Sequence, residues 1–449
     1  MSDAGADTNI GHSTMLPAGP VTGAERFVSI DILRGVAILG ILVMNIYAFA
    51  MPFAAYGNPL VMGGTEPHNL GTWFFTHFFF DQKFLSIFAM LFGAGLVLMS
   101  SRAEQRGARP ARIYYRRQFW LLVIGAIHAY LIWVGDILFA YAAMGMIAYL
   151  FRKRTVRTLV IVGVVLIAIT TAMGYGFSFY VESMREEANE YAELVAAGQE
   201  LDEEQQATLD QWNVTRPMMA ATPEDMQKDI DAHTGSYIQV VNHRAPIVVG
   251  MQQGALFFFG WRILGLMLIG MALMKSGIVT CERSADFYRK MMLGGYIVGL
   301  PLTVYSGLDL YAHEFEPVYV LRYGAYANAL GSIVVALGHI GMVMLIVKTG
   351  YLQRLMQRFG AAGRMALTNY LLHSVILTTV FYGYGLGLYG QIPRFAQMGF
   401  VIAVIALQLY LSPWWLARYR FGPVEWLWRS ITYWKMQPMR QEQESTITR

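Results

Sequence analysis

Apolar runs of about 20 residues, the length that an α-helix needs to cross a bilayer, recur along the chain and constrain its fold more than any other feature. Only 14% of its residues are charged, against about 25% in an ordinary soluble domain. The alternating apolar and polar segments that are typical of membrane barrels do not occur in the sequence. The chain is therefore predicted to be all-α, a polytopic bundle of transmembrane helices.

About ten spans are predicted, and the charges of their connections predict an orientation. The connections after spans two, four, six and eight are rich in Arg and Lys, as at residues 102–117 and 152–157. Because cytosolic loops are enriched in these residues, both termini are predicted to be cytosolic. The predicted spans are residues 27–52, 72–100, 114–134, 136–152, 156–181, 250–275, 287–311, 321–347, 365–388 and 395–417.

These spans divide the chain into five regions. They are a disordered cytosolic tail at 1–25, spans one to five at 26–181, an acidic extracytosolic helical loop at 182–249, spans six to ten at 250–420, and an interfacial or cytosolic tail at 421–449. Between Glu182 and Asp231 the chain has fourteen acidic residues and three Lys or Arg. This loop contains good helix formers and is either a small helical cap or a solvated linker.

Ionisable residues inside apolar spans are costly unless they are paired or hydrated, so each one is a functional candidate. Span one carries Asp31 and Arg34, which can pair on one helical face, and Asn45 returns to that face nearly four turns later. In span nine, Asn369 and His373 also share a face. These groups either hold the helices together or, in the case of Arg34, meet an anionic group such as a phosphate.

A second set of polar residues lies in the outward half of the spans. His128 is in span three, and Asp136 begins span four after a turn predicted at Gly135. Asp136 is a good helix cap, which is its structural explanation. The turn also allows it to reach His128 and to raise the basicity of the imidazole, as a general base requires.

Span two adds a second possible acid–base pair, His77 and Asp81, close to Lys83, and Arg262 lies near the outer end of span six. We expect the outward polar residues to share a hydrated cavity, the alternative being separate structural pairs. His68 together with His77 and Asp81 has no recognised metal-binding spacing, and no metal is predicted.

Several other functions find no support in the sequence. The single cysteine excludes an intramolecular disulfide and a cysteine-based metal cluster. The sequence contains no Walker loop, Rossmann fingerprint or nucleophile elbow, so nucleotide hydrolysis and hydride transfer are not predicted. No nucleic-acid partner is predicted either.

Five segments, taken in order, resemble the YeiB-like family of bacterial inner-membrane proteins. They are SIDILRGVAILGILVMNI, DQKFLSIFAMLFGAGLVLM, GAIHAYLIWVGDILFAYAAMG, WRILGLMLIGMAL and GRMALTNYLLHSVI. The family is historically classed as a domain of unknown function and is grouped by fold with the transmembrane acyltransferases. The resemblance implies a multi-pass protein of the bacterial inner membrane. It also implies transfer of an acyl group from cytosolic acyl-CoA to a sugar, lipid or small-molecule acceptor at the outer face, and by analogy a homodimer.

The resemblance also suggests site residues. The sugar O-acyltransferases have an arginine in the first span followed by ten residues and a histidine, whereas here Arg34 is followed by ten residues and Asn45. An amide cannot act as the base, so His128, His77 or His68 must replace it. The catalytic candidates are His128, Asp136, His77 and Asp81. The candidates for binding acyl-CoA are Asp31, Arg34, Asn45, Arg116, Arg117, Asn369 and His373.

Two further functions stay open at this point. A transporter or flippase for a small metabolite or lipid would use the same intramembrane charges as its binding site. A sensor or scaffold is the third possibility. The absence of a convincing repeat between the two halves disfavours transport, and the missing span-one histidine disfavours acyl transfer.

Overall fold

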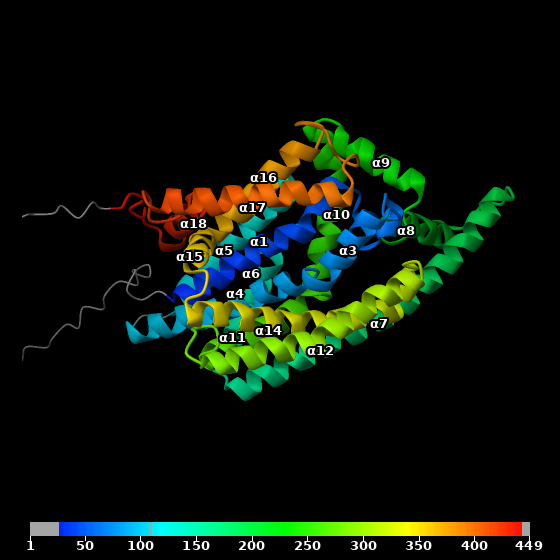
Figure 1. Cartoon of the computed structure of the whole chain (residues 1–449). Coiled ribbons are helices and arrows are strands. Elements are labelled where there is room, and N and C mark those ends of the chain that lie inside the picture. The colour runs from blue at the N-terminus through cyan, green and yellow to red at the C-terminus, as the bar shows by residue number, and fades with distance from the viewer. Residues whose placement is uncertain (1–26, 108–109, 442–449) are drawn as a thin grey trace, which may run out of the picture.

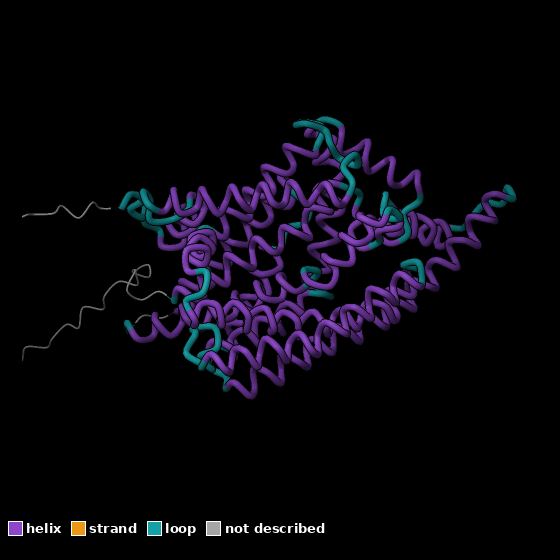
Figure 2. Tube along the Cα trace, in the orientation of Figure 1, coloured by secondary structure: helices purple, strands orange, loops and turns teal. Residues whose placement is uncertain are grey.

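The computed structural model describes residues 27–107 and 110–441, and the regular elements in that part of the chain are helices (Figure 2). The only β-structure among the described residues is an isolated bridge between Tyr419 and Arg440. The all-α prediction is therefore confirmed for these residues. The predicted tail at 1–25 lies outside them, as do residues 442–449.

Most helices are α-helices, with two π-helical turns (η3 and η5) and two 3-10 turns (η2 and η4). They are α1 (Val28–Ala50), α2 (Phe53–Gly57), η2 (Pro59–Val61), α3 (Pro67–Phe79), α4 (Lys83–Gln105), α5 (Pro110–Ile127), η3 (His128–Ile132), α6 (Leu138–Ala148), η4 (Tyr149–Phe151), α7 (Val156–Ala196) and α8 (Glu203–Met219). The chain continues with α9 (Pro223–Thr234), α10 (Tyr237–Phe257), α11 (Gly260–Lys275), α12 (Ala285–Ala312), α13 (Pro317–Tyr319), η5 (Val320–Gly324), α14 (Ala325–Thr349), α15 (Gln353–Arg364), α16 (Ala366–Phe381), α17 (Arg394–Leu416) and α18 (Pro423–Tyr433).

Six helical segments among the described residues are long and apolar enough to cross a membrane: α1, α3 with α4, α7, α12, α13 with α14, and α17. The pair α10 and α11 adds a seventh if it is one span, bent by 53°. The remaining predicted spans coincide with α5, α6 and α16, which are shorter or more charged. Length and composition thus support six or seven of the ten predicted spans.

Helix α1 lies in the interior of the bundle, because most of its residues are apolar and they occur on every side of the helix. In its most apolar stretch 83% of the residues are buried, against 22% for α7 and 28% for both α12 and α17. The apolar residues that α7 leaves exposed, such as Val160 and Val164, are suited to contact with lipid. In the view of Figure 1 both α7 and α12 run along the lower flank of the bundle, where α7 packs on α11 and α12 packs on α14.

The two ends of the bundle differ in their helices and in their charge. Helices α15 and α18 lie at one end, and α8 and α9, which belong to the acidic loop, lie at the other (Figure 1). With 41 residues, α7 is about 62 Å long at 1.5 Å per residue, twice the thickness of a hydrocarbon core. It extends past the bundle at the end where α8 begins (Figure 1). The end of α7, α8, α9 and the start of α10 together make up most of the acidic loop, which is therefore mainly helical.

Helices α1 and α15 cross in close backbone contact at two glycines. A Cβ atom on Gly35 would overlap the carbonyl group of Phe359, and a Cβ atom on Gly363 would overlap the carbonyl of Asp31. Only glycine permits this approach. The contact fixes the end of α1 that carries Asp31 and Arg34 against α15, beside the cavity described below.

Candidate active site

His128 and Asp136 form a buried hydrogen-bonded pair. Nδ1 of His128 lies 2.7 Å from Oδ2 of Asp136, and their side chains are 1% and 2% exposed. The other carboxylate oxygen of Asp136 accepts the backbone N–H of Phe139 at 2.8 Å, in the first turn of α6. A carboxylate can only accept hydrogen bonds, so this contact favours the tautomer of His128 in which Nδ1 carries the proton and faces Asp136. The cap and the imidazole contact suggested by the sequence therefore occur together.

A third residue completes this arrangement. Nε2 of His128 lies 2.8 Å from Oγ of Ser374, a fully buried side chain on α16. Serine, histidine and aspartate joined in this order are the arrangement that activates a serine hydroxyl as a nucleophile. Ser374 was not among the residues predicted from the sequence. Serine is common in helices, and nothing in the sequence relates this one to a histidine 246 positions away.

Local backbone geometry positions His128. The residue begins η3, a π-helical turn of the kind that is frequent at functional sites, and Trp133 N–H closes the turn onto the His128 carbonyl at 2.8 Å. Gly125 lies one turn before it. A Cβ atom on Gly125 would lie 2.9 Å from Oδ1 of Asp136, so glycine is what allows the 133–137 turn to pack on α5.

The turn between η3 and α6 lies inside the bundle. The helical segment Leu138–Phe151 that follows it is about 21 Å long, too short to cross a hydrocarbon core of about 30 Å. Irregular backbone at such a depth must have its polar groups satisfied by protein. Tyr370 on α16 does this, because its hydroxyl donates to Gly135 O at 3.1 Å and accepts from Ile137 N–H at 3.2 Å.

A cavity of about 270 Å³ opens among α1, α4, α5, α15, α16 and α18. Its lining is strongly basic at the end near α15 and α18, and it reaches Leu138, Tyr141 and Tyr370 inside the bundle. The arginines that line it are Arg34, Arg102, Arg106, Arg117, Arg364 and Arg429. Guanidinium groups bind phosphate oxygens in bidentate fashion, so this lining is suited to a polyanionic ligand.

Three of the predicted acyl-CoA-binding residues line this cavity. Asp31 and Arg34 are joined by a 3.0 Å ion pair, and the Arg117 guanidinium stacks on Trp428 of α18 with a 4.3 Å separation. Arg116, the neighbour of Arg117, instead lies 5.8 Å from the ring of Trp434. Asn45 is buried in α1 outside the lining.

The predicted pair on α16 faces another helix. Asn369 donates to Ala362 O and to Ser412 Oγ, both at 3.1 Å, and Nε2 of His373 lies 2.8 Å from Gln408 Oε1. Ser412 and Gln408 belong to α17. The two residues share a face as predicted, and that face binds α16 to α17.

Tyr370 connects the basic cavity with the His128 pair. It belongs to the cavity lining, and its ring centroid is 5.2 Å from that of His128. The cavity therefore ends one aromatic ring away from the Ser374–His128–Asp136 arrangement.

His77 and Asp81 form a second polar cluster at the break between α3 and α4. Nδ1 of His77 lies 3.4 Å from Asp81 Oδ2, which also accepts a 2.7 Å hydrogen bond from Asn328. The fully buried Lys83 donates to the His77 carbonyl and to Asn328 Oδ1. His68 forms an exposed pair with Glu66, and its ring lies edge-on to Phe395 with centroids 5.8 Å apart. Contacts of His77 and His128 thus fall in separate clusters, each with partners of its own.

Comparison with known proteins gives the family of the chain. The family model described as "Protein of unknown function (DUF418)" matches residues 273–435. The uncharacterized protein YeiB of Escherichia coli is 33% identical over 91% of this chain and 96% of its own length. The uncharacterized protein YxaH of Bacillus subtilis is 31% identical over 94% of this chain and 98% of its own length. The chain belongs to the DUF418 family. No solved structure matches it.

The DUF418 match includes Tyr370, Ser374 and Glu425 but begins after His128 and Asp136. Both of these lie in the part of the chain that is covered by the alignments with the full-length YeiB-like relatives. The DUF418 region therefore contributes α16 and α18, and the preceding half contributes the histidine and the aspartate.

Proposed function

We propose that this DUF418 protein is a membrane acyltransferase that moves an acyl group from cytosolic acyl-CoA, through Ser374, to an acceptor at the outer face. One observation carries the proposal. An arginine-lined cavity at one end of the bundle stops at Tyr370, whose ring packs on the histidine of a Ser–His–Asp arrangement.

The proposal includes an orientation in a bacterial inner membrane. In it, all ten helical segments cross the bilayer or line its interior, and the end with α15 and α18 faces the cytosol with both termini. The distribution of Arg and Lys supports this, since basic residues gather at that end and α8 and α9 at the other end belong to the acidic loop.

The donor enters from the basic end. Its phosphates bind the arginines of the lining, among them Arg34 and Arg117, and its thioester extends toward Tyr370. Charge-assisted hydrogen bonds of this type contribute about 1.5–3 kcal/mol each. The apolar part of the lining, including Leu121 and Leu138, contacts the pantetheine arm and the acyl chain.

The first half-reaction transfers the acyl group to the protein. Nε2 of His128 takes the proton of Ser374 as Oγ attacks the thioester carbonyl carbon, and the C–S bond breaks as the tetrahedral intermediate collapses. The leaving CoA thiolate takes the proton from His128. Asp136 keeps Nδ1 protonated and stabilises the imidazolium that forms.

The second half-reaction delivers the acyl group. A hydroxyl or amine of the acceptor attacks the Ser374 ester, His128 takes the acceptor proton, and that proton returns to Oγ as the C–O bond to serine breaks. Because Ser374 holds the acyl group between the two steps, donor and acceptor need not reach His128 at the same time. This removes the need for one continuous tunnel through the bundle.

A second candidate function, transport of a small metabolite or lipid, is favoured by the His77 cluster. Lys83 and Asp81 are ionisable groups at a helix break inside the bundle, and Nε2 of His77 has no hydrogen-bond partner among the described residues. Broken helices with buried charges are found at the substrate and ion sites of transporters. Transport requires no covalent intermediate on Ser374, so the two functions are experimentally distinct.

The experiment is a search for acyl-Ser374 by mass spectrometry. The purified full-length protein is mixed with acetyl-CoA or longer acyl-CoA, without an acceptor, and peptides are examined for an added acyl mass while released CoA thiol is quantified. We expect one acyl group on Ser374 with a burst of free CoA. Ser374→Ala should abolish both, and Ser412→Ala, which alters another buried serine at the α16–α17 contact, should abolish neither. A Ser374→Ala protein that still turns over acyl-CoA would refute the covalent route, and absence of acyl-CoA binding would refute the enzyme.

A further inference from the structure

Three side chains with metal-ligating atoms meet in the acidic loop, at the end of the bundle opposite the basic cavity. Asp229 and His233 are one turn apart on α9, and His243 is on α10. A carboxylate oxygen of Asp229 and one ring nitrogen of each histidine lie within 4.8 Å of one another. Nε2 of His243 is 2.8 Å from Oδ1 of Asp229. All three side chains are partly exposed, between 9% and 32%, so an ion can reach them.

Neighbouring groups fix the orientation of these side chains. Tyr389 donates its hydroxyl to Oδ2 of Asp229 at 2.7 Å, and its ring stacks on His233 with centroids 4.3 Å apart. Nδ1 of His233 lies 2.9 Å from the Asp229 carbonyl and 3.4 Å from Oδ1 of the same residue. Carboxylates that bind metals are usually held by an outer hydrogen bond of the kind that Tyr389 supplies to Asp229.

A second cluster in the chain has similar contacts but contains one histidine instead of two. It therefore serves as a comparison for the proposed metal site. Asp309, His313 and Tyr319 repeat the same contacts: Nδ1 of the histidine is 2.9 Å from the Asp309 carbonyl, and the tyrosine stacks on it at 3.7 Å and donates to the carboxylate at 2.9 Å. Both histidines lie at the C-terminal end of a helix. The feature that the first arrangement has in addition is His243.

We propose that Asp229, His233 and His243 form a site for a divalent transition metal, with Zn²⁺ as its best-suited occupant. Two imidazoles and one carboxylate are a ligand set that Zn²⁺ uses when its fourth position is open, with bonds of about 2.0–2.2 Å. In a tetrahedral site such ligand atoms lie about 3.4 Å apart, so small side-chain rotations from the present positions suffice.

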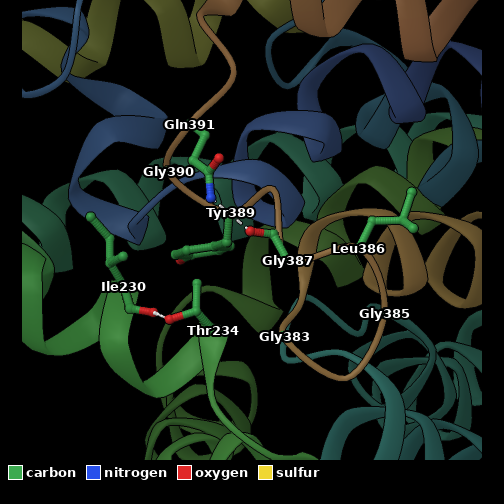
Figure 3. Close-up of a pocket in the computed structure, with 9 residues that line it drawn as sticks. All are labelled: Ile230, Thr234, Gly383, Gly385, Leu386, Gly387, Tyr389, Gly390 and Gln391. Carbon is green, nitrogen blue, oxygen red and sulfur yellow. Dashed lines mark hydrogen bonds between the residues drawn. The ribbon is translucent and has the colours of Figure 1, made fainter.

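A pocket lies beside the proposed site. Ile230 and Thr234, which follow Asp229 and His233 on α9, line a pocket of about 420 Å³ together with Tyr389 and the glycine-rich loop at 383–390. Figure 3 shows the Tyr389 ring lying between α9 and this loop. The bound metal would join α9 and α10, and through Tyr389 it would stabilise the loop between α16 and α17.

The test is metal binding by the full-length protein in detergent, and it is independent of the proposed acyl transfer. After treatment with EDTA and removal of the chelator, Zn²⁺ is titrated by calorimetry and metal content is measured by mass spectrometry. We expect one tight site per chain in the wild type and in His313→Gln, the matched control. His243→Gln should lose the site, and Tyr389→Phe should weaken it by about 10- to 100-fold, as is typical when an outer partner of a ligand is removed.

Cobalt substitution gives a second readout that does not depend on any variant. Co²⁺ bound to the wild type should show the intense visible absorption of a tetrahedral site, and Zn²⁺ should displace it. Equal Zn²⁺ binding by His243→Gln and His313→Gln, or an octahedral Co²⁺ spectrum with no tight Zn²⁺ site, would overturn the proposal. If His243→Gln fails to fold, the wild-type Co²⁺ spectrum and the Tyr389→Phe affinity still decide the question.

Discussion

The ring of Tyr370 packs against the imidazole of His128, with centroids 5.2 Å apart, while the same side chain forms part of the wall of the basic cavity. Its hydroxyl also satisfies two backbone groups of the turn that carries Asp136. Tyr370 therefore both separates the donor cavity from the proposed catalytic residues and supports their geometry.

Removing the hydroxyl of Tyr370 should impair turnover more than donor binding. Tyr370→Phe leaves Gly135 O and Ile137 N–H without partners, at a cost of about 1–3 kcal/mol for each buried group. We expect a lower rate of acyl transfer with a nearly unchanged dissociation constant for acyl-CoA, measured by stopped-flow kinetics and calorimetry. Tyr141→Phe is the matched control, because Tyr141 also lines the cavity but donates to Leu85 O. Equal rates in the two variants would contradict this role for Tyr370.

Replacing Asp136 by asparagine should reduce the rate of acylation without altering the fold. In Asp136→Asn the side-chain amide oxygen can still cap α6, but the amide no longer fixes the proton of His128 on Nδ1 or stabilises the imidazolium. A loss on the order of 10²–10⁴ in rate is expected. Asp81→Asn tests the other pair and should leave the rate close to that of the wild type. If Asp81→Asn has the larger effect, the base is His77 and not His128.

Two adjacent arginines on α5 provide a test of the donor site. Arg117→Gln removes a guanidinium from the cavity lining, whereas Arg116→Gln removes one that lies beside Trp434. We expect Arg117→Gln to raise the dissociation constant for acyl-CoA at least about tenfold, the equivalent of one charge-assisted hydrogen bond. Arg116→Gln should have a small effect. Titration calorimetry measures both, and a reversed order would place the donor outside this cavity.

Glu425 of α18 should stabilise the helix that carries Ser374. Its Oε1 accepts the backbone N–H groups of Leu367 and Thr368, in the first turn of α16, and its Oε2 accepts the Thr368 hydroxyl. Glu425→Ala leaves these donors unpaired and should lower the unfolding temperature, because each buried unpaired donor costs about 1–3 kcal/mol. Glu425→Gln keeps one acceptor oxygen, so its unfolding temperature should lie between those of the wild type and Glu425→Ala. A thermal melt in detergent measures all three.

The junction of α8 and α9 should weaken in acid. Burial raises the pKa of Asp225, but hydrogen bonds from Thr222 and Arg216 outweigh burial and hold the pKa below its ordinary value. A carboxyl with a lowered folded-state pKa contributes stability above its unfolded pKa of about 3.9, and this stability is lost as the pH falls through the folded value. The protection of α9 amides against hydrogen exchange, relative to the intrinsic rate at each pH, should therefore fall below about pH 4. Asp225→Asn should produce the same loss of protection at neutral pH.

The sequence predicted the residues on each helix better than the contacts between helices. The His128–Asp136 contact follows from a short turn, so local spacing was enough to predict it. On α16 the i,i+4 spacing singled out Asn369 and His373, which face α17. The pair that meets His128, Tyr370 and Ser374, has the same spacing and lies one residue further along, a rotation of about 100° around the helix. Periodicity alone cannot decide between two faces that both carry polar residues.

The basic cavity was predicted only in part, for a related reason. Arg34 and Arg117 were identified by their own segments, but Arg429 and Trp428 enter the site from α18, a helix that the sequence placed at the membrane surface. The metal-ligand cluster at Asp229 was missed because it depends on the packing of α10 against α9, which no local spacing records.

The length of α7 has a consequence for the position of α8. An uninterrupted helix bends only gently along its course, and α7 continues as one helix to Ala196, after which residues 197–202 lead into α8. Trp212 of α8 packs in one apolar cluster with Val181 and Met184 of α7, so α8 is held along α7 and does not swing about the link. The two helices therefore form one stiff projection at the end of the bundle opposite α15 and α18 (Figure 1).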